Sequence, residues 1–309
     1  MKYQEQCQSI ISQIKEYYCD HQNITPLLMA SFLVKGHVLI EGPPGTGKTS
    51  LAKMMSVMLS KSFSRIQCTS DLLPQDITGY SILRGDQLEF VSGPVFSDFL
   101  LVDELNRASP RAQSALLEAM EERQVSIDGK THDLGRNFFV IATQNPQDHE
   151  GTFPLPEVQL DRFLLCINTE HANKETEQKL LQLYLDQKIP IDFSIIQKEN
   201  LDLDQVFAEI LKIKIDQSLV NYITDLLEKT RKHELIAYGA SLRAGLALVK
   251  CAQALAYLNG RAMVVPDDIK LLAKPVLSHR LALSSQAIFQ NMSKDACINA
   301  ILMELPFPS

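Results

Sequence analysis

A short glycine-rich stretch carries the residue types that could bind phosphate, and its sequence is Gly42-Pro43-Pro44-Gly45-Thr46-Gly47-Lys48-Thr49. It fits the pattern G-x-x-x-x-G-K-[ST] at every defined position. Glycines let backbone N–H groups turn toward phosphate oxygens, and the positive end of a following helix points at the same oxygens. Lys48 would reach the β and γ phosphates, and the hydroxyl of Thr49 would bind Mg²⁺. The sequence therefore predicts a nucleotide-binding loop.

Two carboxylates end an apolar stretch, Phe99–Val102, which predicts a buried strand. Asp103 would hold Mg²⁺ through water, and Glu104 would orient and polarise an attacking water molecule. Acidic residues at strand ends are often only solvated. At the ligand-binding end of a parallel sheet that also carries a phosphate loop, however, the catalytic interpretation is favoured. The second carboxylate indicates hydrolysis, because a metabolite kinase would instead need a pocket for an acceptor hydroxyl.

Three further polar residues could act on the same phosphates. Asn145 follows an apolar stretch and could hydrogen-bond the γ phosphate or the attacking water; alternatively, it caps the turn that follows. Arg162 lies at the start of the last strand candidate, where it could reach a neighbouring subunit's nucleotide or pair with Asp161 or another carboxylate. Arg243 lies in the first turn of a long helix, just after Ser241, a natural N-cap. A cation there opposes the helix dipole, which favours a functional role.

The elements that must position these residues follow from the hydrophobic pattern. Short apolar strand candidates alternate with helical stretches and lie at 37–40, 99–102, 138–143 and 163–168. This alternation predicts a parallel sheet with helices on both faces. Helical spacing of apolar residues predicts two short helices within residues 1–35, a helix from Lys48 to about Ser60, and an amphipathic helix over Pro110–Arg123.

The Pro110–Arg123 helix is expected to bury a stripe made of Ala112, Ala115, Leu116, Ala119 and Met120. Its charged residues are expected to form a solvated or subunit-facing rim, made of Glu118, Glu121, Glu122 and Arg123. Past residue 168 only helical patterns follow, at 174–186, 216–231 and 241–258, and the last helix should end at Asn259-Gly260. We therefore expect an α/β nucleotide-binding domain over residues 1–170 and a helical domain over residues 171–309.

Composition limits the classes of protein that fit. The chain has 309 residues, of which 45% are hydrophobic and 22% are charged, so a large core can form and general disorder is excluded. The net charge of −7 weighs against general nucleic-acid binding. Six cysteines without a CxxC pair or a His cluster indicate buried or half-buried thiols in a reducing compartment. Without a visible signal peptide or membrane span, we expect a soluble, cytoplasmic protein.

With these residues in place, the chain resembles the AAA+ ATPases and, within them, the MoxR family. The stretches that carry the resemblance lie at 36–49, 93–125, 138–146, 150–165 and 238–244. The resemblance covers nearly the whole chain and is weakest between about 172 and 214. It implies an α/β AAA+ P-loop domain with a five-stranded parallel sheet, followed by an all-α lid domain.

The resemblance also implies roles for the matched positions. The residues that would bind ATP are Gly42, Pro43, Pro44, Gly45, Thr46, Gly47, Lys48, Thr49, Ser50 and Asp103, with Thr49 and Asp103 also holding Mg²⁺. The resemblance implies four catalytic residues, namely Glu104, Asn145 as sensor 1, Arg162 as the arginine finger and Arg243 as sensor 2. An extra helix before the lid can reposition sensor 2 in this clade, so Arg243 could serve its own nucleotide or the neighbour's. The family usually has proline where this chain has Leu242, which loosens the preference for a helix start there.

Two insertions typical of the clade are also expected as β-hairpins. One lies within Ile77–Gly93 and turns at Gly85-Asp86, and the other lies within Gln124–Arg136 and turns at Asp128-Gly129. In relatives such hairpins face the pore of the ring or its partner, although they could equally be ordinary surface hairpins.

The implied function is a Mg²⁺-dependent ATPase that forms a homo-oligomeric ring, with a hexamer expected, and remodels or matures a protein partner. The resemblance associates such ATPases with partners that carry von Willebrand factor A domains, but no residue here identifies a client. The alternative is a DNA-directed motor of the helicase or restriction type, against which the net charge and the lack of a basic stripe weigh. Glu104, Asn145 and the lid arginine disfavour a small-molecule kinase.

Overall fold

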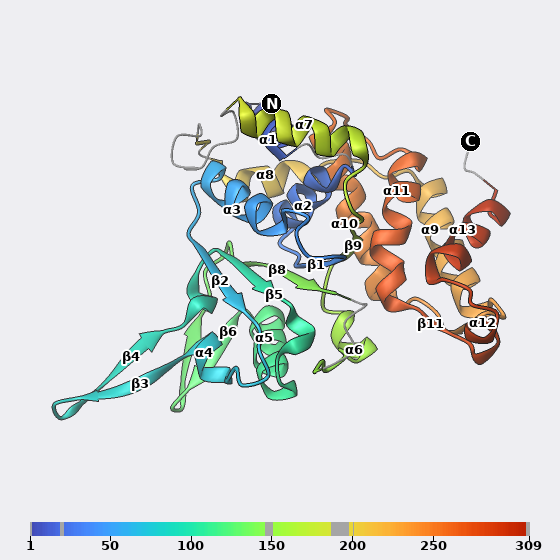
Figure 1. The fold of residues 1–309 in the computed structure, drawn as a ribbon. Coiled ribbons are helices and arrows are strands. Elements are labelled where there is room, and N and C mark those ends of the chain that lie inside the picture. Colours follow the sequence, from blue (N-terminus) through green and yellow to red (C-terminus); the bar gives the residue numbers. More distant parts are fainter. Residues whose placement is uncertain (1, 19–21, 146–150, 187–197, 200, 307–309) are drawn as a thin grey trace.

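A five-stranded parallel sheet forms the centre of the α/β part of the chain (Figure 1). The computed structural model describes residues 2–18, 22–145, 151–186, 198–199 and 201–306. The strands run in the spatial order β2-β5-β8-β1-β9, with bounds β1 (Val38–Glu41), β2 (Phe63–Gln67), β5 (Phe99–Asp103), β8 (Phe139–Gln144) and β9 (Leu165–Asn168). All pairings in this sheet are parallel, as predicted. Strand β2 was not among the strands predicted from the apolar pattern.

Both faces of the sheet are apolar and covered. In β5, Phe99 and Leu101 join one buried cluster with residues of the N-terminal and C-terminal helices, whereas Leu100 and Val102 join a second cluster on the other face. The period of two that sends alternate side chains to opposite faces therefore leaves no polar face in the central strands. This burial explains why the central strands read as continuous apolar runs in the sequence.

Helices of the α/β part cover the two faces. The first cluster includes residues of α1 (Lys2–Tyr18), α2 (Ile24–Leu33) and α3 (Lys48–Met58). The second includes residues of α4 (Pro74–Thr78) and α5 (Pro110–Glu122), and of the short 3₁₀ turns η1 (Pro94–Phe96) and η2 (Leu105–Arg107). The predicted stripe of α5 is buried except for Ala115, which is half-buried.

The part of the chain after β9 is mainly helical. Its elements are α7 (Lys174–Leu185), α8 (Leu203–Ile210), α9 (Gln217–Lys232), α10 (Leu242–Leu258), α11 (Pro266–Leu277), η4 (Ser278–Arg280), α12 (Ser285–Phe289) and α13 (Lys294–Glu304), with a two-stranded ribbon of β10 (Ile236–Tyr238) and β11 (Ala282–Leu283). Helix α10 lies against α2 and α11 (Figure 1). It ends before Asn259-Gly260 as predicted, and Gly260 has a φ of 76°. Ser241 occupies the N-cap position as predicted, although its side chain makes no capping hydrogen bond.

Both predicted hairpins are present. Strands β3 (Gly79–Arg84) and β4 (Gln87–Ser92) form the first, which extends away from the body of the molecule (Figure 1). Strands β6 (Gln124–Ile127) and β7 (Lys130–Asp133) form the second. The ring of Phe90 in β4 stacks on His132 in β7 with centroids 4.3 Å apart, so the two hairpins are in contact.

The cysteines of the described residues are buried free thiols, namely Cys7, Cys68, Cys166, Cys251 and Cys297, as predicted. Cys19 lies outside the described residues. Within the described part of the chain, every helix is too short or too polar to cross a membrane.

Candidate nucleotide-binding site

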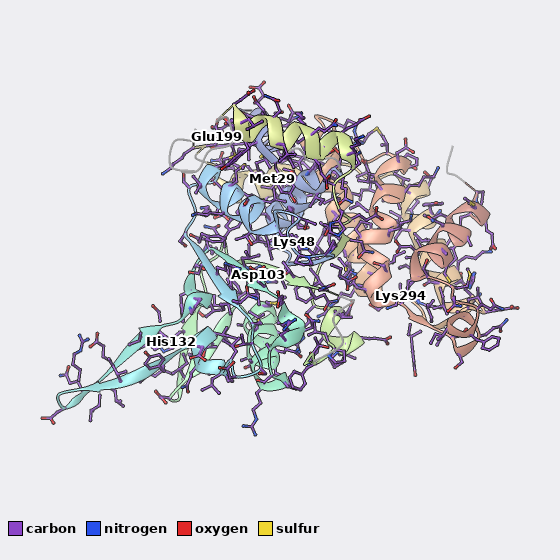
Figure 2. The ribbon with its side chains drawn as sticks, in the orientation of Figure 1. Met29, Lys48, Asp103, His132, Glu199 and Lys294 are labelled. Carbon is purple, nitrogen blue, oxygen red and sulfur yellow. The ribbon has the colours of Figure 1, made fainter. Side chains whose placement is uncertain are left out.

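An open pocket of about 380 Å³ lies at the carboxyl ends of β1, β5 and β8. Figure 2 shows Lys48, at the start of α3, and Asp103, at the end of β5, in this region. The pocket has the size of a small-molecule site. Its walls bring together the phosphate loop with the start of α3 and residues within or directly after three strands, β2, β5 and β8, namely Gly42, Pro44, Gly45, Thr46, Gly47, Lys48, Thr49, Ser50, Arg65, Gln67, Asp103, Glu104, Thr143, Gln144 and Asn145.

The phosphate loop depends on glycine at positions where the backbone is left-handed or crowded. Gly45 and Gly47 have φ values of 80° and 77°. A Cβ added to Gly42 would lie 2.1 Å from the hydroxyl of Thr169. Gly47 occupies the N-cap position of α3 without a side-chain cap, which leaves the first N–H groups of that helix available to an anion.

The ammonium group of Lys48 is held by the loop itself. It donates hydrogen bonds to the carbonyl oxygens of Gly42 and Pro43 at 3.0 and 2.7 Å. Partial burial lowers the pKa of Lys48, and the negative charge of Asp103 opposes this shift. Pro43 does not line the pocket, and its contribution is the carbonyl oxygen that accepts from Lys48.

Asp103 is held by two residues that the sequence analysis did not single out. Its Oδ1 accepts a hydrogen bond from the hydroxyl of Thr143 at 3.2 Å, and its Oδ2 accepts one from Nε of Arg65 at 2.6 Å. The hydroxyl of Thr143 also accepts from the backbone N–H of Glu104 at 3.0 Å. Thr143 thus ties together the two acidic positions, while Arg65 reaches across from the neighbouring strand β2.

Glu104 and Asn145 face the same pocket. Glu104 has a φ of 57°, a left-handed conformation that is costly outside glycine and that concentrates at functional sites. Its carboxylate contacts Nε of Arg107 at 2.7 Å. The carbonyl oxygen of Asn145 accepts from the side-chain amide of Asn106 at 3.4 Å. The two residues expected to act on the attacking water therefore lie in one pocket.

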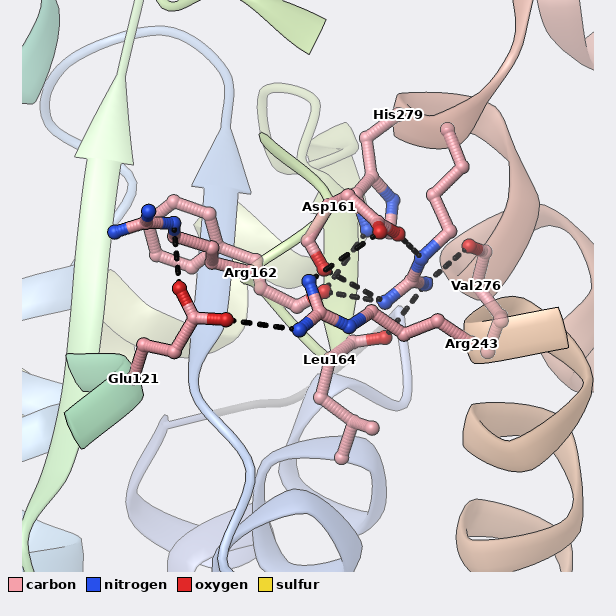
Figure 3. Close-up of polar contacts among 9 residues, drawn as sticks. Glu121, Asp161, Arg162, Leu164, Arg243, Val276 and His279 are labelled. Atoms are coloured by element: carbon pink, nitrogen blue, oxygen red, sulfur yellow. Dashed lines mark hydrogen bonds and ion pairs between the residues drawn. The ribbon is translucent and has the colours of Figure 1, made fainter. Parts of the chain in front are cut away.

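Arg162 and Arg243 do not line this pocket. They lie at a second open pocket of about 370 Å³ together with Glu121, Asp161 and Arg280. Nε of Arg162 lies 3.1 Å from one carboxylate oxygen of Glu121, and Nη2 of Arg243 lies 3.0 Å from the other (Figure 3). The ion-pair interpretation of Arg162 is thus correct for the single chain, with Glu121 as the partner.

Asp161 joins the same group of charges. It accepts from Nε of Arg280 at 2.6 Å and from Nη1 of Arg243 at 3.4 Å. Arg280 is almost fully buried and also donates to backbone carbonyl oxygens, including that of Phe163 at 2.6 Å. Three guanidinium groups therefore share two carboxylates at this pocket.

The end of α5, which carries Glu121, is fixed by a buried histidine and a half-buried arginine. Nδ1 of His37 accepts from the backbone N–H of Val140 at 3.0 Å, so the proton lies on Nε2, which donates to the carbonyl oxygen of Met120 at 3.2 Å. The guanidinium of Arg123 donates to the carbonyl oxygens of Lys35 and Phe138. Arg123 was expected at a solvated or subunit-facing rim; within the chain it is half-buried, because these carbonyls take up its donors.

The buried His37 should make stability depend on pH. Burial lowers the pKa of His37 from 6.5 to about 3. The neutral, buried His37 therefore contributes fully to the free energy of unfolding above pH 6.5. This contribution is lost as the pH falls from 6.5 toward 3, by at most about 1.4 kcal/mol per pH unit, because only the unfolded state takes up the proton there. His37→Gln cannot titrate, so the loss of stability between pH 7 and pH 5 should be smaller than in the wild type. Denaturant melts at both pH values measure this difference, and equal losses would contradict it.

Known proteins resemble the chain along its whole length. Residues 37–165 match the model of the ATPase family associated with various cellular activities (AAA), and residues 228–301 match the AAA lid domain. The chaperone MoxR1 of Mycobacterium tuberculosis is 37% identical, over 96% of this chain and 81% of the relative. Protein MoxR of Paracoccus denitrificans is 30% identical, over 92% of this chain and 91% of the relative.

An uncharacterised protein of Bacillus subtilis, YeaC, is 40% identical, over 100% of this chain and 98% of the relative. A crystal structure from Cytophaga hutchinsonii, described as a “putative ATPase”, superposes with a TM-score of 0.91 at 35% identity and covers 100% of this chain and 96% of that one. The parallel sheet, the phosphate loop at its carboxyl end and these relatives agree, and the chain belongs to the MoxR family of AAA+ ATPases, which hydrolyse ATP.

Proposed function

We propose that this ATPase depends on Mg²⁺ and acts as a homo-oligomeric ring, with a hexamer expected, that remodels or matures a protein partner. The observation that carries the proposal is the separation of the predicted catalytic residues into two pockets. Glu104 and Asn145 share a pocket with the phosphate loop, whereas Arg162 and Arg243 lie at the other pocket. A ring would bring the arginines of one subunit to the phosphates of the next, which completes the site.

The phosphate-loop pocket has the donors that Mg²⁺ prefers. The hydroxyl of Thr49 and the carboxylate of Asp103 are hard oxygen ligands in one pocket, so these two residues would hold a magnesium ion there. Bound there, the ion would neutralise charge that develops on the transferring phosphoryl group. Lys48 would exchange its two loop carbonyl partners for the β and γ phosphates, and the N–H groups at the start of α3 would donate hydrogen bonds to the phosphate oxygens.

The remaining residues of this pocket would act on water. Glu104 accepts the proton of the attacking water, and Asn145 holds that water or the γ phosphate by a hydrogen bond. Thr143 fixes the backbone of Glu104 and the carboxylate of Asp103 at once, so base and metal ligand keep their relative positions. Arg162 and Arg243 of the neighbour supply positive charge at the transition state.

A protein client is favoured over DNA. The relative from Mycobacterium tuberculosis is named a chaperone, and the net charge of this chain is −7. The comparisons give no support to the DNA-directed alternative. The resemblance to the MoxR family supports the proposal that this partner carries a von Willebrand factor A domain. ATPase stimulation by such a partner, without stimulation by single-stranded DNA, is the expected outcome.

The ring proposal predicts that activity depends on assembly. Specific ATPase activity should rise with protein concentration over the range in which the mass, measured by analytical ultracentrifugation with ATP and Mg²⁺, rises from one chain to the ring. A chelator of Mg²⁺ should abolish the activity. Full specific activity in a species of single-chain mass would refute the ring proposal, and full activity without Mg²⁺ would refute the metal assignment.

A further inference from the structure

The second pocket contains a carboxylate with two functional partners. Glu121 contacts Arg162 through one oxygen at 3.1 Å and Arg243 through the other at 3.0 Å (Figure 3). The three residues come from different segments, because Glu121 lies in the last turn of α5, Arg162 in the turn before β9 and Arg243 in the first turn of α10. Glu121 is thus the common partner of two arginines that lie far apart in the sequence.

The carboxylate offsets two unfavourable charge effects. The guanidinium groups of Arg162 and Arg243 repel each other, and Arg243 also opposes the dipole at the start of α10. The hydrogen bond to Glu121 is the main cause that raises the pKa of Arg243. Asp161 contributes less, since its contact with Arg243 is 3.4 Å long and its shorter contact, 2.6 Å, goes to Arg280.

The backbone that carries Glu121 is held in place. Just before Glu121, the carbonyl oxygen of Met120 accepts a hydrogen bond from His37. Just after the helix, the side chain of Arg123 donates to the carbonyl oxygens of Lys35 and Phe138. At its other end, α5 is tied to the segment that follows Glu104, because the side-chain amide of Gln113 donates to the carbonyl oxygen of Leu105 at 3.2 Å. A rigid element therefore presents the carboxylate, as an organised site requires.

We propose that Glu121 is a positioning residue, which holds Arg162 and Arg243 side by side so that both reach the nucleotide of the neighbouring subunit together. Glu121 itself does not touch the nucleotide in this arrangement. The inference rests on the ring function proposed above and adds to it a residue for which the comparisons give no role.

The test uses Glu121→Gln, with Glu122→Gln as the matched control on the same exposed turn. Glutamine keeps the size of the side chain but loses the charge that holds two guanidinium groups. The turnover of assembled Glu121→Gln rings should fall about 10- to 100-fold, the cost of misplacing catalytic groups. ATP affinity and melting temperature should stay at wild-type values, and Glu122→Gln should keep wild-type turnover.

Mixing experiments show on which side of the interface Glu121 acts. A Lys48→Ala chain is expected to bind no nucleotide but carries intact arginines, whereas an Arg162→Ala chain has an intact phosphate loop but no finger. Glu121→Gln chains mixed with Lys48→Ala chains should regain activity, because some Glu121→Gln sites then receive well-placed arginines. Mixed with Arg162→Ala chains, they should show no more activity than the two chains assayed separately.

Three results would overturn the inference alone, provided that the reference mixture of Arg162→Ala and Lys48→Ala recovers activity. They are wild-type turnover in Glu121→Gln, recovery of activity on mixing with Arg162→Ala, and an equal loss in Glu122→Gln. A reference mixture that forms mixed rings but recovers nothing would instead refute the ring function and the inference with it.

Discussion

Glu104→Gln is expected to bind ATP as tightly as the wild type and to hydrolyse it at least about 100-fold more slowly, the usual range for loss of a general base. Glutamine retains the length of Glu104 and can keep the left-handed backbone and the hydrogen bond from its N–H to Thr143. It cannot accept a proton from water. Single-turnover hydrolysis, measured beside ATP binding by calorimetry, separates the chemical step from affinity, and rings loaded with unhydrolysed ATP should persist.

The matched control is Glu118→Gln, an exposed carboxylate on α5 outside both pockets. It should keep wild-type turnover. Loss of the ion pair with Arg107 could also disturb the site, so Arg107→Gln is a second control, and it should cost much less than Glu104→Gln. Turnover of Glu104→Gln within a few-fold of the wild type would show that another group activates the water.

The sequence predicted the phosphate-loop pocket well because its parts are local. The loop, the strand before it and the helix after it are contiguous, and Asp103 and Asn145 end apolar runs that can only be buried strands. Parallel strands place their carboxyl ends at one edge, so residues remote in sequence meet there without further information. The two hairpin turns were predictable for the same reason, since turn residues such as Asp128-Gly129 act locally.

Strand β2 and Arg65 were missed because the strand lies at the edge of the sheet. Only Ile66 of its five residues is buried, so no apolar run marks it. Its position beside β5 nevertheless brings Arg65 to the carboxylate of Asp103. An isolated arginine in a weak strand pattern carries no sign of this contact, which depends on the register between two strands.

The ion pairs of the second pocket could not be predicted from the sequence for a similar reason. Arg162 and Arg243 were singled out one at a time, but their common partner Glu121 was expected only as part of a solvated or subunit-facing rim of an amphipathic helix. The pairing arises only when the start of α10 is placed against the end of α5 (Figure 3). Ion pairs between distant segments have no periodicity, so neither spacing nor composition predicts them.

Arg162→Ala is expected to slow ATP hydrolysis more than Glu104→Gln does. An arginine finger supplied by a neighbour is worth about 10³- to 10⁵-fold in rate, or roughly 4 to 7 kcal/mol of transition-state stabilisation. Truncation should leave ATP binding in the phosphate-loop pocket intact, because Arg162 lies at the other pocket. Activity should then stay low at every protein concentration. Arg136→Ala, which removes an arginine whose side chain is 83% exposed, is the matched control and should behave as the wild type.

Mixing distinguishes an arginine that acts on the neighbour from one that acts on its own site. Arg162→Ala and Lys48→Ala chains should each be inactive alone, since one lacks the finger and the other lacks the phosphate contacts. In mixed rings of equal amounts, about one quarter of the interfaces pair an intact phosphate loop with an intact finger. Activity should therefore return to a corresponding fraction of the wild type. If mixed rings form, as shown by pull-down of one tagged chain, and yet no activity returns, Arg162 serves only the ion pair with Glu121.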